Sequence, residues 1–128
     1  MPIHQEVTID ASPAAVFGVL TSSADFTRMS GGRAATISPE AGGAVSLFGG
    51  EIEARNVELV PAKRVVQAWR AKGWPDGLYS IVRFELAAAG KGTKLVFDQA
   101  GHPDEAAPML EGGWHQMYWQ PMQAMFGK

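Results

Sequence analysis

A series of short turn signals separates strand-length segments in the middle of the chain. Glycine supplies left-handed backbone conformations and proline fixes φ, so such clusters are typical of tight turns. Connections of so few residues force consecutive strands to run antiparallel, and we therefore predict an antiparallel meander. The turn signals are Ala41-Gly42-Gly43, Gly49-Gly50, Pro61-Ala62-Lys63, Pro75-Asp76-Gly77 and Gly90-Lys91-Gly92, and the expected strands are 34–38, 44–48, 51–60, 64–70, 79–87 and 93–100.

Apolar and polar residues alternate in the later strands. Val82, Phe84 and Leu86 alternate with Arg83 and Glu85. A period of two residues indicates strands with one covered face and one face in water. We therefore expect helices to cover a single face of the sheet.

The strand expected over 51–60 breaks this alternation. We favour a β-bulge near Arg55-Asn56, because a bulge would return all apolar residues to one face. The alternative keeps a regular register and points Asn56 and Glu58 inward, where an unpaired carboxylate is costly. The residues that change phase are Ile52 and Ala54 on one face, and Val57 and Leu59 on the other.

The N-terminal region predicts one strand and two short helices. Residues 3–10 alternate in polarity, as a half-buried strand does. Ser12-Pro13 is a strong helix start, since the serine hydroxyl can accept a free backbone N–H and proline suits the first helical turn. A second helix is expected over 23–29, ending before a pair of glycines.

The C-terminal region predicts a long amphipathic helix from about Leu110 onward. Pro121 should kink it unless the helix is already irregular there. We expect this helix to cover the sheet, because the two N-terminal helices are too short to do so. Its apolar residues at helical spacing are Leu110, Trp114, Met117, Tyr118, Pro121, Met122 and Met125.

Composition and charge narrow the classes of function. The 128 residues fit one domain spanning 1–128. The absence of cysteine excludes disulfides, thiolate catalysis and Cys-based metal sites. A net charge of -2 without a basic stripe argues against nucleic-acid binding. No secretion signal and no apolar run near the ~18 residues of a membrane span are present, so we expect a cytoplasmic protein without membrane contact.

No constellation of catalytic or metal-binding residues stands out. His4, His102 and His115 are scattered and lack the spacing of metal ligands, so we expect no metal site. Glu51 and Glu53 share a strand face with a cation, which favours a solvated row of charges over acid–base chemistry. We therefore predict no catalytic residue and no cofactor.

The order of these elements resembles the helix-grip fold, the START-like and birch-pollen-allergen-like α+β architecture of the SRPBCC superfamily. The chain is most similar to single-domain relatives of the C-terminal domain of the heat-shock protein 90 ATPase activator. The resemblance implies a curved antiparallel sheet wrapped around the C-terminal helix, with a cavity between them. The stretches that carry it are residues 9–17, 57–61 and 65–70, Phe84-Glu85-Leu86, Gly92-Thr93-Lys94-Leu95 and Gly113-Trp114.

Aromatic and methionine side chains are the best candidates to line such a cavity. Methionine adapts to irregular shapes, and Trp69 and Tyr79 add polar groups that could orient a ligand. Buried amides need partners, and a ligand could supply them. Ordinary core packing is the alternative, and it is favoured for Trp114 and Met117. The predicted lining is Phe48, Gln67, Trp69, Trp74, Tyr79, Gln99, Trp114, Met117, Tyr118 and Met122.

Three functions remain open at this point. The first is non-enzymatic binding of a small apolar or aromatic molecule in the cavity. The second, implied by the resemblance, is partnership with a chaperone of the heat-shock protein 90 type. The third is an enzyme of the polyketide cyclase or aromatase kind, in which Tyr79 or Arg70 would polarise a carbonyl.

Overall fold

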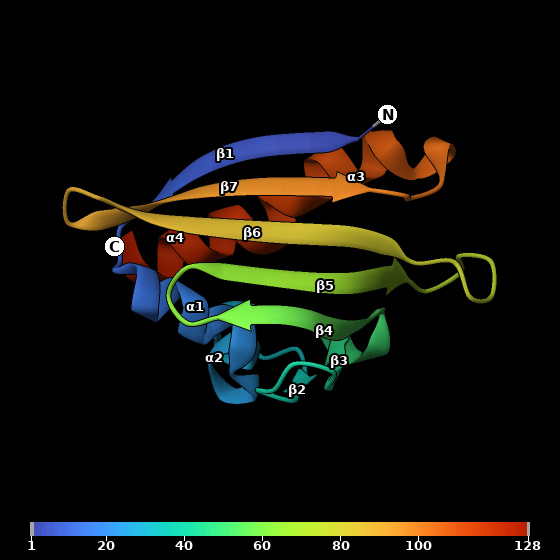
Figure 1. Ribbon diagram of the computed structural model, residues 1–128, viewed down its shortest axis with the longest axis horizontal. Coiled ribbons are helices and arrows are strands. Elements are labelled where there is room, and N and C mark those ends of the chain that lie inside the picture. The colour runs from blue at the N-terminus through green and yellow to red at the C-terminus, as the bar shows by residue number, and fades with distance from the viewer. Residues whose placement is uncertain (1, 128) are drawn as a thin grey trace.

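The computed structural model describes residues 2–127 and contains a seven-stranded antiparallel sheet (Figure 1). The strand order is β1-β7-β6-β5-β4-β3-β2, so all strands after β1 follow as a meander and the last returns beside the first. The predicted meander is confirmed. The strands are β1 (Ile3–Ile9), β2 (Thr36–Ile37), β3 (Ala44–Leu47), β4 (Ile52–Val60), β5 (Arg64–Ala71), β6 (Ser80–Ala89) and β7 (Gly92–Ala100).

A continuous helical segment follows β7 and lies across one face of the sheet. Figure 1 shows it behind β1, β7 and β6, so that one face is covered and the other is open. No helix among residues 2–127 is both long and apolar enough to cross a membrane. The segment consists of the 3₁₀ turn η2 (Asp104–Ala106), α3 (Ala107–Trp114), the π-helical turn η3 (His115–Trp119) and α4 (Gln120–Gly127).

Both N-terminal helices begin at serine caps, and the first of these caps, Ser12, is as predicted. Ser12 Oγ accepts the backbone N–H of Ala15 at 3.2 Å, and Pro13 occupies the first helical position of α1 (Pro13–Thr21). Ser22 caps α2 (Ser23–Met29) in the same way. Each cap satisfies a backbone donor that the helix itself leaves free.

The C-terminal helix passes Pro121 as a helix, with one widened turn before it. The backbone N–H of Gln120 donates to the carbonyl of His115, which is a π-type bond. The widened turn precedes a proline that has no N–H to donate and whose ring crowds the preceding turn. Tyr118 and Trp119, both within this widened turn, are buried.

The core lies between the sheet and this helix and is rich in aromatic rings. The ring centroid of Trp114 lies 4.2 Å from that of Phe97, and the centroid of Trp119 lies 5.4 Å from the same phenylalanine. Both indoles are also anchored by amides: Trp114 Nε1 donates to Gln99 Oε1 at 2.8 Å, and Trp119 Nε1 donates to Gln5 Oε1 at 2.7 Å. The helix is thereby fixed to β7 and β1.

The bulge in β4 is present, but it lies at Val57, just beyond the predicted Arg55-Asn56. The pairing with β5 shifts between Asn56 and Glu58. Val57 therefore stays exposed, and the expectation that it turns inward is wrong. Asn56 is buried instead, because its amide donates to the carbonyl of Ser38 at 2.8 Å. A satisfied amide can lie inside, and Glu58 stays outside.

An exposed histidine joins β1 to β7 on the open face. His4 Nδ1 lies 2.7 Å from Asp98 Oδ1, and His4 Nε2 lies 3.0 Å from Glu6 Oε2. These carboxylates, which also face Arg83 and Lys94, raise the pKa of His4 above its ordinary 6.5, chiefly through the hydrogen bond with Asp98. The charged histidine therefore stabilises the fold below pH 6.5, and this contribution is lost as pH rises through the raised pKa.

We expect an NMR titration to give a His4 pKa above 6.5. Asp98→Asn should lower it, because the variant removes the nearest negative partner of the imidazolium. Asp76→Asn, in an exposed turn, is the matched control and should leave it unchanged. A His4 pKa at or below 6.5 in the unmodified protein would contradict this assignment.

Candidate functional site

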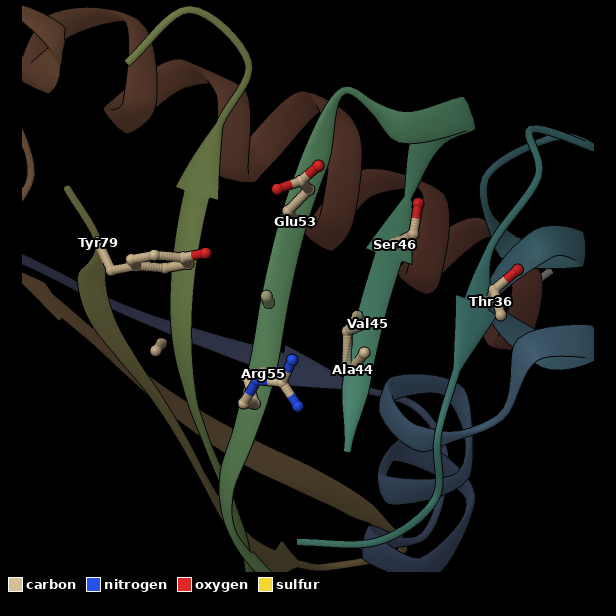
Figure 2. Close-up of a pocket in the computed structure, with 9 residues that line it drawn as sticks. Thr36, Ala44, Val45, Ser46, Glu53, Arg55 and Tyr79 are labelled. Atoms are coloured by element: carbon tan, nitrogen blue, oxygen red, sulfur yellow. The ribbon is translucent and has the colours of Figure 1, made fainter. Parts of the chain in front are cut away.

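Hollows lie on both faces of the sheet. One on the open face, of about 500 Å³, lies over β3, β4 and β5. Figure 2 shows Glu53, Arg55 and Tyr79 around it, with the C-terminal helix behind the sheet. Its walls are mainly small or charged side chains in contact with water. Its lining residues are Thr36, Ala44, Val45, Ser46, Glu53, Ala54, Arg55, Ala68 and Tyr79.

The second hollow, of about 380 Å³, lies between the sheet and the C-terminal helix and is called the helix cavity below. Its volume falls within the range of small-molecule sites, which are apolar with a few polar groups. This composition makes it the candidate site. Its lining residues are Arg33, Phe48, Glu51, Ile52, Trp69, Ala71, Met109, Leu110, Gly113, Trp114, Gln116, Met117 and Tyr118.

Four aromatic residues from different elements form the inner wall of the helix cavity. Trp69 comes from β5 and its ring centroid lies 5.0 Å from that of Trp114 on α3. Phe48 begins the 3₁₀ turn η1 (Phe48–Gly50) with φ 52°, a left-handed conformation that few non-glycine residues adopt. This turn directs the Phe48 ring inward, where it meets Tyr118 edge-on at 5.8 Å.

Two polar atoms of this wall are buried without a partner. Trp69 Nε1 and the Tyr118 hydroxyl form no hydrogen bond with good geometry to any part of the chain from residue 2 to 127. Both side chains are only 3% exposed. Burial raises the pKa of Tyr118 above its ordinary value, and the neighbouring Trp69 indole opposes part of that rise. The hydroxyl therefore stays neutral and keeps its proton to donate.

Charged groups of the helix cavity are confined to its mouth. Arg33 and Glu51 are both exposed. The Arg33 guanidinium lies over the Phe48 ring, 5.2 Å from its centroid, and its Nη2 donates to the Phe48 carbonyl at 3.4 Å. The cavity thus has a neutral aromatic interior and a polar entrance.

Comparison with known proteins places the chain in a family. The family model described as "Activator of Hsp90 ATPase homolog 1-like protein" matches residues 10–127. The chain belongs to this family. The Hsp90-activator-like relationship predicted from the sequence is therefore confirmed.

Curated relatives share the family but are much longer. The human activator of 90 kDa heat shock protein ATPase homolog 1 is 27% identical over 93 residues, covering 73% of this chain and 28% of that protein. The activator of 90 kDa heat shock protein ATPase homolog from Dictyostelium discoideum is 36% identical over 80 residues. This match covers 62% of this chain and 21% of the Dictyostelium protein. The chain thus spans about a quarter of the curated relatives that it matches.

A solved structure supports the helix-grip fold. The crystal structure of an HSP90 activator from Plasmodium falciparum superposes with a TM-score of 0.93, at 24% identity, covering 99% of this chain and 96% of that chain. The predicted fold class, a curved antiparallel sheet with a long C-terminal helical segment, is confirmed.

Half of the predicted lining residues lie together in the helix cavity of this Hsp90-activator-like chain. The C-terminal helix contributes three of them and the sheet side two. Met122, on the same helix, is fully buried in the core and does not reach the cavity. Whether any of them contacts a ligand remains a prediction. The five lining residues are Phe48, Trp69, Trp114, Met117 and Tyr118.

The two predicted glutamines are buried, but the chain itself supplies their partners. Gln67 Nε2 donates to Asn56 Oδ1 at 3.2 Å. Gln99 Nε2 donates to Ser80 Oγ at 3.0 Å, and its Oε1 accepts the Trp114 indole. Neither amide lines the helix cavity, so neither needs a ligand there.

Three other predicted positions need correction. Tyr79, the residue before β6, is 45% exposed and lies on the open face, in phase with the odd-numbered residues of β6 that point away from the helix. Arg70 accompanies it there: its guanidinium lies 5.7 Å from the Tyr79 ring centroid and donates to the Trp74 carbonyl. Neither can act inside the helix cavity as the enzyme hypothesis required. Trp74 is half-buried and packs edge-on against Trp69 at 5.8 Å without lining the cavity.

Sequence reasoning missed several lining residues. Ile52 and Ala71 could have been found from the inward phase of their strands. Leu110 and Gly113 lie on the helix face that also bears Trp114, and this spacing was available as a signal. Arg33 comes from a loop, where no periodicity indicates direction.

Proposed function

We propose that this chain binds a small, largely apolar or aromatic molecule in the helix cavity. The observation that carries the proposal is the cavity itself. Side chains from β5, η1 and the C-terminal helix line an opening of about 380 Å³ between the sheet and the helix. A concave opening of this size is typical of small-molecule sites.

The chemistry of the walls supports an uncharged, apolar occupant. The rings of Trp69 and Trp114 give the helix cavity an apolar floor, and Met117 can adjust its shape to different ligands. The charges lie at the entrance, where a ligand's polar end could remain in water. This pattern matches the general composition of small-molecule sites.

A pair of adjacent glycines on α3 provides the test. Gly113 lines the helix cavity, whereas Gly112 faces solvent, and an added Cβ meets no atom within 4 Å at either position. The probe is 2-isopropenylnaphthalene, an uncharged aromatic hydrocarbon. We expect Gly113→Leu to weaken binding of this probe at least tenfold, because the leucine side chain would occupy the space of the ligand. Gly112→Leu is the matched control and should leave the affinity within about twofold. Binding is measured by NMR titration of the Trp114 indole N–H.

Two results would count against the proposal. One is the absence of saturable binding by 2-isopropenylnaphthalene and by a panel of lipids and small aromatic compounds. The other is equal affinity of the two leucine variants, which would place binding outside the helix cavity.

Family membership favours a second candidate function, that of a chaperone partner. The curated relatives are named as activators of the 90 kDa heat shock protein ATPase. Because those proteins are about four times as long as the matched region, the activity of the whole protein is a proposal for this chain. A change in the ATPase rate of the organism's own chaperone would support it. An unchanged rate together with no co-purification would contradict it.

A further inference from the structure

The sheet ends in two edge strands of very different length. β2, at one edge, has two residues, whereas β1, at the other, has seven. All seven residues of β1 pair with β7 without a bulge, and within residues 2–127 no strand pairs with its other side (Figure 1). A long regular edge offers free backbone N–H and C=O groups to which another strand can be added. The sheet can therefore be extended at β1.

The free backbone groups of β1 belong to its even-numbered residues. In an antiparallel pair, successive residues direct their N–H and C=O groups alternately toward the neighbouring strand and away from it. The Ile9 carbonyl faces β7, where it lies close to the first residue of that strand. The Thr8 carbonyl faces away from β7 and accepts Nε2 of Gln123 on α4 at 3.1 Å. His4 and Glu6 share the phase of Thr8, so their backbone groups also face outward.

The side chains beside this edge form a row of alternating charge on the open face. The row runs from β6 through β7 to β1 and consists of Arg83, Asp98 and His4, which are cross-strand neighbours. Arg83 Nη2 lies 3.0 Å from Asp98 Oδ2, and His4 Nδ1 lies 2.7 Å from Asp98 Oδ1. The row ends on a cation, because Asp98 and Glu6 raise the pKa of His4. A carboxylate on an added strand would continue the alternation, since opposite charges on neighbouring strands attract.

A second copy of β1 supplies that carboxylate in one register. When two β1 strands run antiparallel about a two-fold axis at Gln5, His4 of each copy lies opposite Glu6 of the other. His4 and Glu6 then exchange their outward backbone bonds with the second copy. An axis at Glu6 or at His4 would instead place like charges opposite each other. In the favoured register the Thr8 carbonyl faces Pro2, which has no N–H, and it keeps its side-chain partner on α4.

We propose that this chain forms a weak two-fold dimer in which β1 pairs antiparallel with β1 of a second copy, with His4 opposite Glu6. The two sheets become one continuous sheet, and both helix cavities lie on the same side of it. This interface is separate from the helix cavity and does not depend on the ligand proposed above.

The helix face of the joint limits its strength. Gln5 lies at the axis and donates to Glu111 Oε1 at 3.2 Å within its own chain. The symmetry brings the two Glu111 carboxylates toward each other, and like charges repel. An interface made by two strands is also small compared with those of stable complexes. We therefore expect dissociation constants of about 10 μM to 1 mM.

Sedimentation velocity at about pH 6, where His4 is charged, tests the dimer at protein concentrations up to about 1 mM. Glu6→Lys should weaken dimerisation about tenfold or more, because it places two cations opposite each other. Glu53→Lys makes the same change on the open face of β4 and is the matched control, with an expected change within about twofold. A chain that stays monomeric at about 1 mM would leave the edge to a strand of another protein and would overturn the proposal. A dimer that tolerates Glu6→Lys would overturn it as well.

A mixture of two charge variants tests the register. His4→Glu places carboxylates opposite each other, so this variant should also lose self-association. The variants His4→Glu and Glu6→Lys complement each other, because both cations of one chain face both carboxylates of the other. We expect a heterodimer at concentrations where neither variant associates with itself. Its absence, with both variants folded by circular dichroism, would contradict the assigned register.

Amide hydrogen exchange in the unmodified protein locates the interface. The N–H groups of His4 and Glu6 should exchange more slowly as the protein concentration rises, because the dimer gives them acceptors. Exchange at these two residues that stays constant while the protein dimerises would place the interface elsewhere and overturn the proposal.

Discussion

Replacing Trp114 with alanine should lower the free energy of unfolding by about 3–5 kcal/mol, the usual cost of deleting a large buried aromatic side chain. Trp114 is 2% exposed and its ring centroid lies within 4.2 Å of that of Phe97 and 4.4 Å of that of Tyr118. The variant also leaves Gln99 Oε1 without its donor. Chemical denaturation of both proteins measures this difference in unfolding free energy. The comparison requires that the unfolding free energy of both proteins depends equally on denaturant concentration.

Met109→Ala is the control for this prediction, because Met109 lies on the same helix and is 80% exposed. Its cost should stay within about 0.5 kcal/mol. A loss below about 1 kcal/mol for Trp114→Ala would mean that its ring contributes to the cavity wall alone and not to the core.

The second large effect is expected at Gly92, the first residue of β7. A Cβ at this position would lie 2.5 Å from the carbonyl oxygen of Ile9, and that atom is backbone in a paired strand. Gly92→Ala should therefore destabilise the fold by roughly 1–3 kcal/mol, as overpacked positions do. Thermal unfolding followed by circular dichroism measures this loss.

Gly112→Ala is the control, and its expected effect on stability has the opposite sign. An added Cβ there meets nothing within 4 Å, and the residue lies in an exposed turn of α3. Alanine should stabilise that helix by about 0.5–1 kcal/mol. If the Gly92 variant were as stable as the Gly112 variant, the close approach of β7 to the end of β1 would be wrong.

Local signals in the sequence were sufficient to predict the antiparallel meander and the N-terminal helices, while the helix-grip arrangement followed from the family resemblance. The turn glycines Gly42, Gly77 and Gly90 adopt positive φ values of 83°, 76° and 60°, which is why glycine marks those turns. The serine cap at Ser12 marked the start of α1 in the same local way. Such features depend on neighbouring residues and can be interpreted without knowing the tertiary contacts.

Errors arose where tertiary contacts override local pattern. A regular helical period places Trp119 off the face shared by Trp114 and Tyr118, yet Trp119 is buried and its indole is held by Gln5, which is far away in sequence. Asn56 looked unsuited to the interior because its partner, the carbonyl of Ser38, lies far away in sequence. Neither contact leaves a trace in the local periodicity.

The part of the candidate site that lies on regular strands and helices was predictable from their periodicity. Residues on regular strands and helices could be placed by phase, and Trp69 and Met117 fell on the correct faces. Tyr79 was misplaced although the alternation of Val82 and Phe84 already puts odd-numbered residues of β6 outside. The two unpaired donors were not predictable, since their isolation depends on the shape of the whole cavity.

The position of a bound probe tests the account most directly. In a complex with 2-isopropenylnaphthalene, intermolecular NOEs should connect the naphthalene protons with the Met117 methyl group and with the Trp114 ring, which line the helix cavity. NOEs to the Ala68 methyl group and the Tyr79 ring, which line the hollow on the open face, would contradict it.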